Sequence, residues 1–322
     1  MDKTPGQTPE VSLPPQDPQS LLEAVHYFSD PDVALDFVRR AVWPNGVPVC
    51  PHCGGLEHSF LTTRRIWKCR NKDCRRQFSA KVGTIFEDSP LGWDKWLPAV
   101  WLIANSKNSV SSHELGRSLH VTQKTAWFML HRIRDAMETG TFRKLDGEVE
   151  VDETYWGGLG RNMHRDRARR QIKGTGMVGK TAVAGLRERA GEVRAVVVPD
   201  TRQPTLQGIV RANVEAGASV YSDALGSYTG LDADYAHKIV DHVREYVSGS
   251  VHTNGIENFW ALLKRALKGT QVHIAPEHLH RYVTERTFAY NYRNRTDLGR
   301  MWLTLGGVSG RRLTYAELIG HD

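Results

Sequence analysis

The sequence predicts a multidomain α/β protein in which a small cysteine-rich ribbon and a helical region precede a domain built on a mixed β-sheet. Three observations lead to this prediction. All four cysteines lie between Cys50 and Cys74. Apolar residues recur at helical spacing between Trp93 and Met137. From Gly147 onward, short valine-rich runs come first and helical stretches follow, which is typical of a sheet with helices packed on it.

The length of 322 residues leaves room for several domains, and 40% hydrophobic with 25% charged residues is ordinary for a globular protein. We expect an acidic N-terminal region over 1–45, partly disordered, with short helices between Leu21 and Arg40 interrupted at Ser29-Asp30-Pro31. The first twenty residues are Pro-rich and polar, unlike a secretory signal, and no apolar run is long enough to cross a bilayer. The expectation is a cytoplasmic protein without a membrane partner.

The positive charge is unevenly distributed. The net charge is +7 and the pI about 9.2, yet the chain up to Asp36 carries seven acids and one base. Residues 64–81 contain eight Lys or Arg against one acid, and residues 161–180 contain seven against one. Such concentrations favour binding of phosphates, although a solvated basic surface has the same composition.

The four cysteines form two close pairs, Cys50 with Cys53 and Cys69 with Cys74, fifteen residues apart. Each pair suits a tight turn that presents two thiolates, and two such turns complete the tetrahedral shell of a structural Zn²⁺. A zinc ribbon over 46–86 is therefore expected, with hairpin strands near Phe60 and Trp67. The alternatives are unconnected reduced thiols or a redox pair, and His52 is a possible competing ligand.

Residues 87–140 are expected to form a helix-turn-helix. Ser111 and Glu114 have the spacing of a capping box, and Thr122 suits the cap of a second helix. Ala126, Trp127, Leu130, Ile133 and Met137 would then face the core, leaving a polar set for the outside: Gln123, Lys124, His131, Arg132 and Arg134. A basic second helix is the geometry that enters the major groove of DNA, whereas the plainer interpretation is a helical hairpin with a solvated face.

Three acidic residues in 145–270 have positions that suit metal binding. Asp152 lies in a run where valines alternate with acids, Asp223 ends a short strand, and Glu257 lies in a helix with Lys264 and Lys268 on the same face. Carboxylates that converge from distant segments can hold two Mg²⁺ or Mn²⁺ ions for phosphodiester chemistry. Any one of them alone is more often a solvated surface charge. Glu150 and Glu153 flank Asp152, and strand alternation places Glu150 on the same face.

The sequence resembles bacterial insertion-sequence transposases of the DDE type with an N-terminal zinc ribbon, the ISXO-like branch. The resemblance is carried by CPHCG, CRNKDCRRQFSAKVGTIFEDSPL, VEVDETYWGG, GMVGKTAV, VYSDALGSY and HTNGIENFWALLKRALKGT, and it covers roughly Cys50 to Tyr292. It implies an RNase H-like catalytic domain over 145–270, followed by a basic helical tail over 271–322. It also implies that Asp152, Asp223 and Glu257 are the catalytic acids, the second and the third being 34 residues apart.

The resulting functional hypothesis is a transposase that binds terminal inverted repeats, cleaves DNA with Mg²⁺ or Mn²⁺, and joins the freed 3′-hydroxyl to target DNA. We expect a homo-oligomer on paired DNA ends, at the nucleoid, with the double-stranded DNA contacted by a basic set: Lys124, Arg132, Arg134, Arg161, Arg165, Lys264 and Lys268. The rival hypotheses are a DNA-binding regulator that does not cut and an RNase H-type nuclease that does not join. His237, His242 and His252 are open to roles as catalytic helpers, DNA contacts or ordinary polar neighbours. Asn254 and Asn258 either contact DNA or merely cap and decorate the helix.

Overall fold

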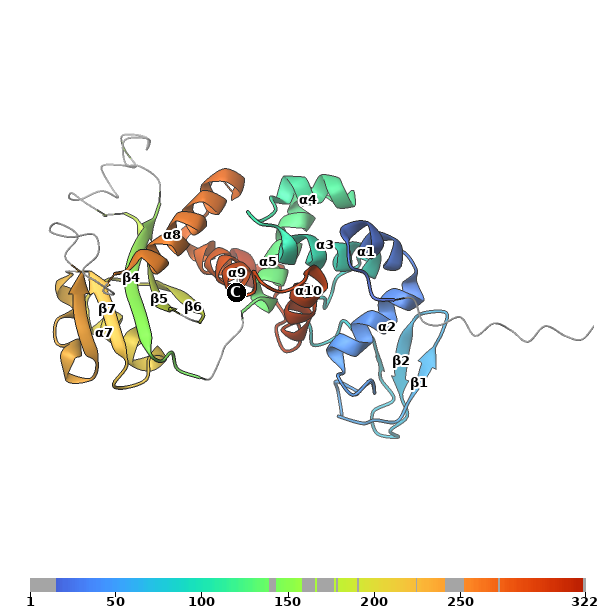
Figure 1. Cartoon of the computed structure of the whole chain (residues 1–322). Coiled ribbons are helices and arrows are strands. Elements are labelled where there is room, and N and C mark those ends of the chain that lie inside the picture. The colour runs from blue at the N-terminus through green and yellow to red at the C-terminus, as the bar shows by residue number, and fades with distance from the viewer. Residues whose placement is uncertain are drawn as a thin grey trace, which may run out of the picture.

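The computed structural model describes residues 16–138, 143–157, 166, 177, 179–189, 191–223, 225–240, 252–271 and 273–320. The molecule is elongated, with a β-sheet body at one end, a three-stranded ribbon at the other, and helices between them (Figure 1). Among the described residues, no helix has both the length and the apolar character that crossing a membrane requires.

The N-terminal half forms a helical body around one hydrophobic core. The expected break between two short helices is confirmed, because Asp30 caps the second through hydrogen bonds from the backbone N–H groups of Asp32 and Val33. The helices of this half are α1 (Leu21–Tyr27), α2 (Pro31–Val42), α3 (Trp93–Asn105), α4 (Ser112–Leu119) and α5 (Gln123–Ala136).

The C-terminal helices belong to this same core and do not form a separate tail. α10 (Asp297–Gly306) packs on α2, α3 and α5, and its Met301 and Leu305 are fully buried. Val308 accepts a backbone hydrogen bond from Ile85, and the short α11 (Tyr315–Ile319) follows. The sequence-based boundary at 271 therefore does not coincide with a structural one, since the last helices complete a body that begins before residue 50.

The ribbon contains β1 (His58–Leu61), β2 (Ile66–Cys69) and β3 (Gln77–Phe78) as an antiparallel sheet. The expected hairpin is confirmed, with Phe60 opposite Trp67. Trp67 also stacks on Phe78 and meets Trp43 edge-on, with ring centroids 6.0 and 5.1 Å apart. This aromatic cluster is small, so a bound metal would contribute much of the ribbon's folding free energy.

The second body contains a mixed sheet in the order β6-β5-β4-β7-β8. β4 (Glu148–Trp156), β5 (Thr181–Glu188) and β6 (Val193–Val198) are antiparallel, whereas β7 (Ser219–Asp223) runs parallel to β4, and β8 (Ala236–Val240) runs parallel to β7. The short 3₁₀ helices η2 (Gly226–Tyr228) and η3 (Leu231–Ala233) connect β7 to β8. A mixed α/β domain after a cysteine-rich ribbon agrees with the sequence-based fold class.

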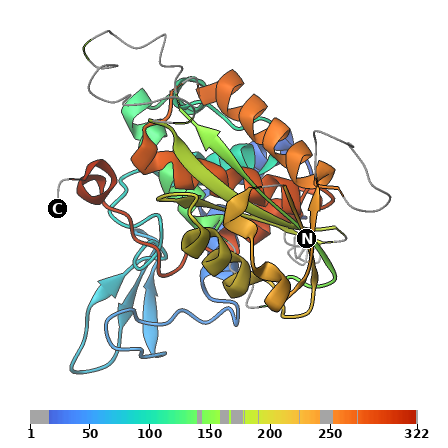
Figure 2. The same cartoon turned by 90° about the vertical axis from the view of Figure 1, so that its left-hand side faces the viewer.

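Helices cover both faces of this sheet (Figure 2). α7 (Gln203–Asn213) packs on the face formed by Val149 and Val151. α8 (Asn254–Ala266) packs on the other face, against β4 and β5. A π-helical turn, η4 (Leu267–Gln271), ends α8, and η5 (Pro276–His278) leads into α9 (Leu279–Asn291), which packs on β6. Side chains along β4 alternate between these two layers, as strand geometry requires.

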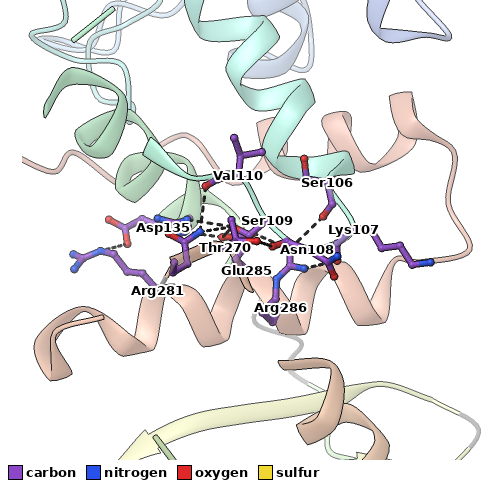
Figure 3. A network of polar contacts seen from close by, with 12 residues as sticks. Ser106, Lys107, Asn108, Ser109, Val110, Asp135, Thr270, Arg281, Glu285 and Arg286 are labelled. Carbon is purple, nitrogen blue, oxygen red and sulfur yellow. Dashed lines mark hydrogen bonds and ion pairs between the residues drawn. The ribbon is translucent and has the colours of Figure 1, made fainter. Parts of the chain in front are cut away.

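A buried polar network joins the two bodies (Figure 3). Glu285 of α9 lies at its centre and accepts hydrogen bonds from Arg134, Arg286 and Ser109 at 2.7, 2.7 and 3.1 Å. Thr270 and Gln271 of η4 donate to the carbonyls of Asn108 and Val110 in the loop between α3 and α4. The end of α8 is thereby hydrogen-bonded to the segment that leads into α4.

Candidate active site and cysteine cluster

The ribbon brings the four cysteines together as the sequence spacing predicted. The Sγ atoms of Cys50 and Cys74 lie 3.7 Å apart and those of Cys53 and Cys69 lie 3.6 Å apart. All four sulfur atoms lie within 4.8 Å of one another. Tight turns at both pairs create this cluster, including the left-handed Gly54 after Cys53. Four thiol ligands at such spacing fit a tetrahedral Zn²⁺.

The thiols also have unequal acidity. Burial alone would raise the pKa of Cys50, but N–H groups of His52 and Cys53 and the neighbouring thiols lower it to about 7. Burial raises the pKa of Cys69 to about 12, helped by the same neighbouring thiols. Four clustered thiolates repel one another, so a divalent cation is needed to keep all four deprotonated. His52 contacts Arg76 at 3.3 Å and is not part of the described cluster.

Asp152 lies on the α8 side of the central strand β4. Its strand partner is Gly185 of β5, and the missing side chain there lets Trp260 of α8 pack against the strand. The indole Nε1 of Trp260 donates to Asp152 Oδ2 at 3.0 Å. Asp152 is thus oriented by a buried aromatic side chain from the helix that also carries Glu257.

Asp223 ends the neighbouring parallel strand β7. The ladder pairs Glu148 with Ser219 and Glu150 with Tyr221, a constant offset of 71 residues. Continued two residues beyond the last hydrogen-bonded pair, this offset brings Asp152 level with Asp223, and adjacent strands are about 4.8 Å apart. Asp223 Oδ1 also accepts a hydrogen bond from the backbone N–H of Leu225 at 3.0 Å, which fixes the carboxylate at the end of the strand.

Glu257 lies in the first turn of α8, where the N-terminal end of the helix favours a negative charge. Its Oε1 accepts a hydrogen bond from Thr253 Oγ1 at 3.0 Å. Trp260, one turn further on, reaches Asp152, so the same helix holds the third acid and the residue that orients the first.

The three carboxylates converge electrostatically. Burial raises the pKa of Asp152 to about 6, and the negative charges of Asp223 and Glu257 contribute to the rise, although Glu153 N–H and Trp260 oppose it. Their oxygen atoms are more widely spaced than the thiols, because among the described residues only the cysteines form a group of three or more ligand atoms within 4.8 Å. The three acids thus lie in one region, but their oxygen atoms are not gathered around a single point.

The structure distinguishes Asp152 from the two neighbouring glutamates. Glu150 does share its face, but it is fully buried and accepts hydrogen bonds from Ile256 N–H, Arg187 and Arg189 at 2.8, 3.3 and 3.2 Å. Glu153 lies on the opposite face, where Tyr228 OH donates to it at 2.9 Å. Burial and the nearby Asp223 and Asp152 raise the pKa of Glu153 to about 7. Glu150 connects β4 to α8 through its hydrogen bond from Ile256. Asp152 is the acid whose pKa is raised by the charges of both Asp223 and Glu257.

Cations border the acids on one side. Burial lowers the pKa of Lys264, and the charge of Asp152 acts in the opposite direction, while Lys268 and Lys180 lower it further. Lys264 of α8 therefore lies near Asp152, and Lys268 of η4 and Lys180, just before β5, lie near Lys264. A group of lysines beside carboxylates suits a phosphate chain that passes over the acids.

The predicted outward orientation of His131, Arg132 and Arg134 is wrong. Arg134 is fully buried and bonds Glu285, and Arg132 is 3% exposed and donates to the carbonyls of Leu313 and Glu87. The second half of α5 is enclosed by α3, α9 and α10, so these side chains have no access to DNA. Four residues that were predicted to face the core are buried: Ala126, Leu130, Ile133 and Met137.

The exposed part of α5 is its first turn. Thr122 caps the helix, as predicted, by accepting a hydrogen bond from Thr125 N–H, and Ser111 caps α4 in the same way. Lys124 is exposed, with its Nζ 4.3 Å from the centre of the Tyr315 ring. Arg161 and Arg165, predicted to bind DNA, lie outside the described residues, as does His242.

Sequence reasoning did not identify several residues that shape the site. Trp260 was not among the candidate site residues, although its spacing of three residues from Glu257 places it on the same helical face. Arg187 and Arg189 pair with Glu150, and Tyr228 with Glu153, across 37 to 75 residues, which no local pattern shows. Of the histidines, His237 contacts Ser222 Oγ at 2.8 Å, and His252 lies 3.6 Å from Glu150.

Two family models match the chain. Residues 144–291 match the ISXO2-like transposase domain, and residues 29–77 match a transposase zinc-ribbon domain. A protein in the transposable element ISH50 of Halobacterium salinarum is 28% identical over 247 residues, covering 73% of this chain and 82% of that protein. A transposase-like protein of Haemophilus influenzae is 34% identical over 101 residues, which is 31% of this chain and 81% of that protein.

Proposed function

Because the chain belongs to the ISXO2-like family of insertion-sequence transposases, we propose that it binds the terminal inverted repeats of its element and cleaves and joins DNA there. Asp152, Asp223 and Glu257 are the catalytic acids of this proposal. The observation that carries it is that burial, together with the charges of Asp223 and Glu257, raises the pKa of Asp152, which lies in β4 beside the strand that Asp223 ends. Converging acids with perturbed pKa values mark functional sites more often than structural ones.

An RNase H-like assignment of the sheet body is part of the proposal. Its support is a mixed five-stranded sheet whose central strand bears the first acid and whose neighbouring parallel strand ends in the second. The third acid comes from a helix packed over both β4 and β5. The first two acids of the proposal thus lie on the neighbouring interior strands β4 and β7, and the third lies on the helix over one face of the sheet.

The donor chemistry fits Mg²⁺ or Mn²⁺. All three acids offer oxygen ligands, which these hard cations prefer, and their mutual repulsion would be relieved by bound positive charge. Two such ions lie about 4 Å apart, and each lies about 2 Å from its ligands. Carboxylates that hold both ions are therefore spread over more than the 4.8 Å span of the cysteine cluster, which fits one ion. When bound, such ions acidify a water molecule and stabilise the departing oxygen.

The protein's own residues position the reactants. Trp260 holds Asp152, Thr253 holds Glu257, and Lys264 and Lys268 provide charge for the DNA phosphates. A water oxygen first bonds to phosphorus as the bond to the 3′ oxygen breaks, leaving a 3′-hydroxyl and a 5′-phosphate. That 3′ oxygen then attacks a target phosphorus, and one phosphodiester replaces another. The second step needs no external energy source, because the bonds broken and formed are equivalent.

In this proposal the ribbon and the helical body recognise DNA. The ribbon is basic, and the first turn of α5 carries exposed Gln123 and Lys124, the end of a recognition helix that meets base edges in helix-turn-helix proteins. Arg161 and Arg165 are proposed phosphate contacts. Arg132 and Arg134 are not, because they are buried. Paired element ends at the nucleoid would require a homo-oligomer.

The test is a strand-transfer assay with full-length zinc-loaded protein, Mg²⁺, and end DNA chosen from inverted repeats that flank the gene. Asp152→Asn, Asp223→Asn and Glu257→Gln should each lower cleavage and joining by about a hundredfold to a thousandfold, since metal stabilisation contributes several kcal/mol. Glu215→Gln, which neutralises an exposed acid away from the site, is the matched control and should act as wild type.

Full activity in the three variants would overturn the catalytic assignment. Binding of the end DNA with no metal-dependent product would indicate a regulator, and cleavage without joined product would indicate a nuclease.

A further inference from the structure

A basic groove lies on the back of α8, away from the carboxylates. It has a volume of about 600 Å³ and is bounded by the end of α3 with the following loop, by α8, by α9 and by α10. Its floor is apolar, formed mainly by Phe259, Leu262 and Leu263. This volume lies within the roughly 300–1,000 Å³ of ligand-binding clefts. We call it the α8 groove.

Helix geometry separates the α8 groove from the active site. Successive residues are rotated by about 100°, so Glu257, Trp260 and Lys264 cluster on one side of α8. Phe259 and Leu262 project from the opposite half of the helix and Arg265 from its flank, and all three line the groove. A DNA strand over the acids therefore cannot also fill the groove, and an occupant of the groove is a second molecule or a second segment.

The charge of the groove is strongly positive. The lining residues include no acid but five basic side chains: Lys107, Arg265, Arg286, Arg293 and Arg300. Arg300 is paired with Asp297, whereas the side chains of Lys107 and Arg265 have no hydrogen bond or ion pair with any residue that the structure describes. Arg293 stacks over Tyr290, with its guanidinium carbon 4.5 Å from the ring centre, and donates a hydrogen bond to the carbonyl of Tyr290.

Buried charge behind the groove adds to this potential. Arg286 is 6% exposed and shares Glu285 with Arg134, so two guanidinium groups face one carboxylate. The Nε of Arg286 has no hydrogen-bond partner among the described residues. Arg286 also donates to the carbonyl of Lys107 at 2.8 Å, which fixes the loop that forms one wall (Figure 3). The network that fixes this wall contains two guanidinium groups and one carboxylate, so it carries one excess positive charge.

We propose that the α8 groove binds the phosphate backbone of a second DNA duplex, one that is not lying over the carboxylates. Positive charges that line a concave surface with a partly apolar floor fit a sugar-phosphate strand, since the cations meet phosphates and the floor meets deoxyribose. The inference rests on the proposed function for the identity of the polyanion. It adds that each chain holds DNA on two opposite sides of α8.

The test measures binding of a 30-base-pair duplex of arbitrary sequence to full-length protein by fluorescence anisotropy, between about 50 and 300 mM salt. Arg265→Ala/Arg293→Ala should weaken binding about tenfold and reduce the slope of log K against log salt by about 1.8, since each phosphate contact contributes about 0.9. Arg202→Ala/Arg211→Ala on α7 removes the same charge from the other side of the sheet and should change binding less than twofold.

A second variant guards against misfolding. Leu262 is 40% exposed on the groove floor, so Leu262→Glu places a negative charge in the groove without disturbing the core and should also weaken binding. Equal losses in the α7 control would show that only net charge matters, and wild-type binding by both groove variants would also overturn the inference.

The strand-transfer assay separates the two claims. Wild-type cleavage with unchanged DNA binding in the groove variants would refute the groove alone. Loss of binding in those variants, from a protein with no metal-dependent activity, would refute the proposed function and leave the groove standing.

Discussion

Removal of Glu285 is the sharpest test of how the two bodies are joined. Glu285 is 1% exposed, and burial would raise its pKa, yet Arg286 and Arg134 lower it overall, so the carboxylate is charged in the folded protein. Glu285→Ala leaves both guanidinium groups, 0% and 6% exposed, without their acid. Breaking one buried ion pair costs about 3–5 kcal/mol, and with two cations stranded we expect the loss to approach about 5 kcal/mol.

That loss should be visible as a lower melting temperature. A body of about 160 residues shifts by roughly 2–4 °C per kcal/mol, so Glu285→Ala should melt about 10–20 °C below wild type in circular dichroism. Glu285→Gln keeps an acceptor for Arg134 and should lose less. Glu138→Ala removes a 67% exposed partner of Arg311 and should shift the melting temperature by less than about 2 °C. A melting temperature for Glu285→Ala within 2 °C of wild type would refute the reasoning.

Three further predictions concern the metal, the pH dependence and the discontinuous core. Wild type should contain one zinc per chain by colorimetric titration, whereas Cys69→Ser should lose it and its ribbon should become protease-sensitive; a full zinc complement in the variant would contradict the ribbon assignment. Burial and nearby cations lower the pKa of His131 to about 2, so its contribution to stability is complete above the unfolded pKa of 6.5 and falls by about 1.4 kcal/mol per pH unit below it. His131→Phe should lack this part of the slope between pH 6.5 and 4.5 in urea titrations, and identical slopes would show that His131 is not buried neutral. A chain that ends at Arg295 lacks the buried Met301, Leu305 and Val308, so limited proteolysis should degrade residues 16–138; a resistant fragment of that region would mean that α10 is dispensable.

The locally encoded features were predictable from sequence. Paired cysteines fix a ribbon because both turns and ligands lie within 25 residues, and the caps at Ser111 and Thr122 act on N–H groups three residues away. Alternation along β4 likewise placed Asp152 and Glu150 on one face, as their separate contacts with α8 confirm. Patterns of this kind depend on local geometry, which tertiary packing preserved here.

The buried arginines were not predictable in this way. Helical periodicity assigns charged residues to solvent, since an unpaired buried charge is costly. Arg134 avoids that cost through Glu285, and Arg132 through the carbonyls of Leu313 and Glu87. The partners lie 45 to 181 residues away along the chain. A periodic pattern cannot show whether a distant partner exists, so long-range ion pairs are its characteristic failure.

α9 explains why domain boundaries read from the sequence differ from the physical ones. Its Leu279, Tyr282 and Val283 pack with α8 and the sheet, whereas Phe288, two turns later, packs in the helical body. Cutting the chain near residue 140 would therefore leave the helical body without Phe288 and α10. Removing the C-terminal segment would in turn expose the α8 side of the sheet, where Glu257 and Trp260 are held. Each body needs the same helix to complete its core, so loss of α9 would weaken both the helical body and the packing that holds Glu257 and Trp260.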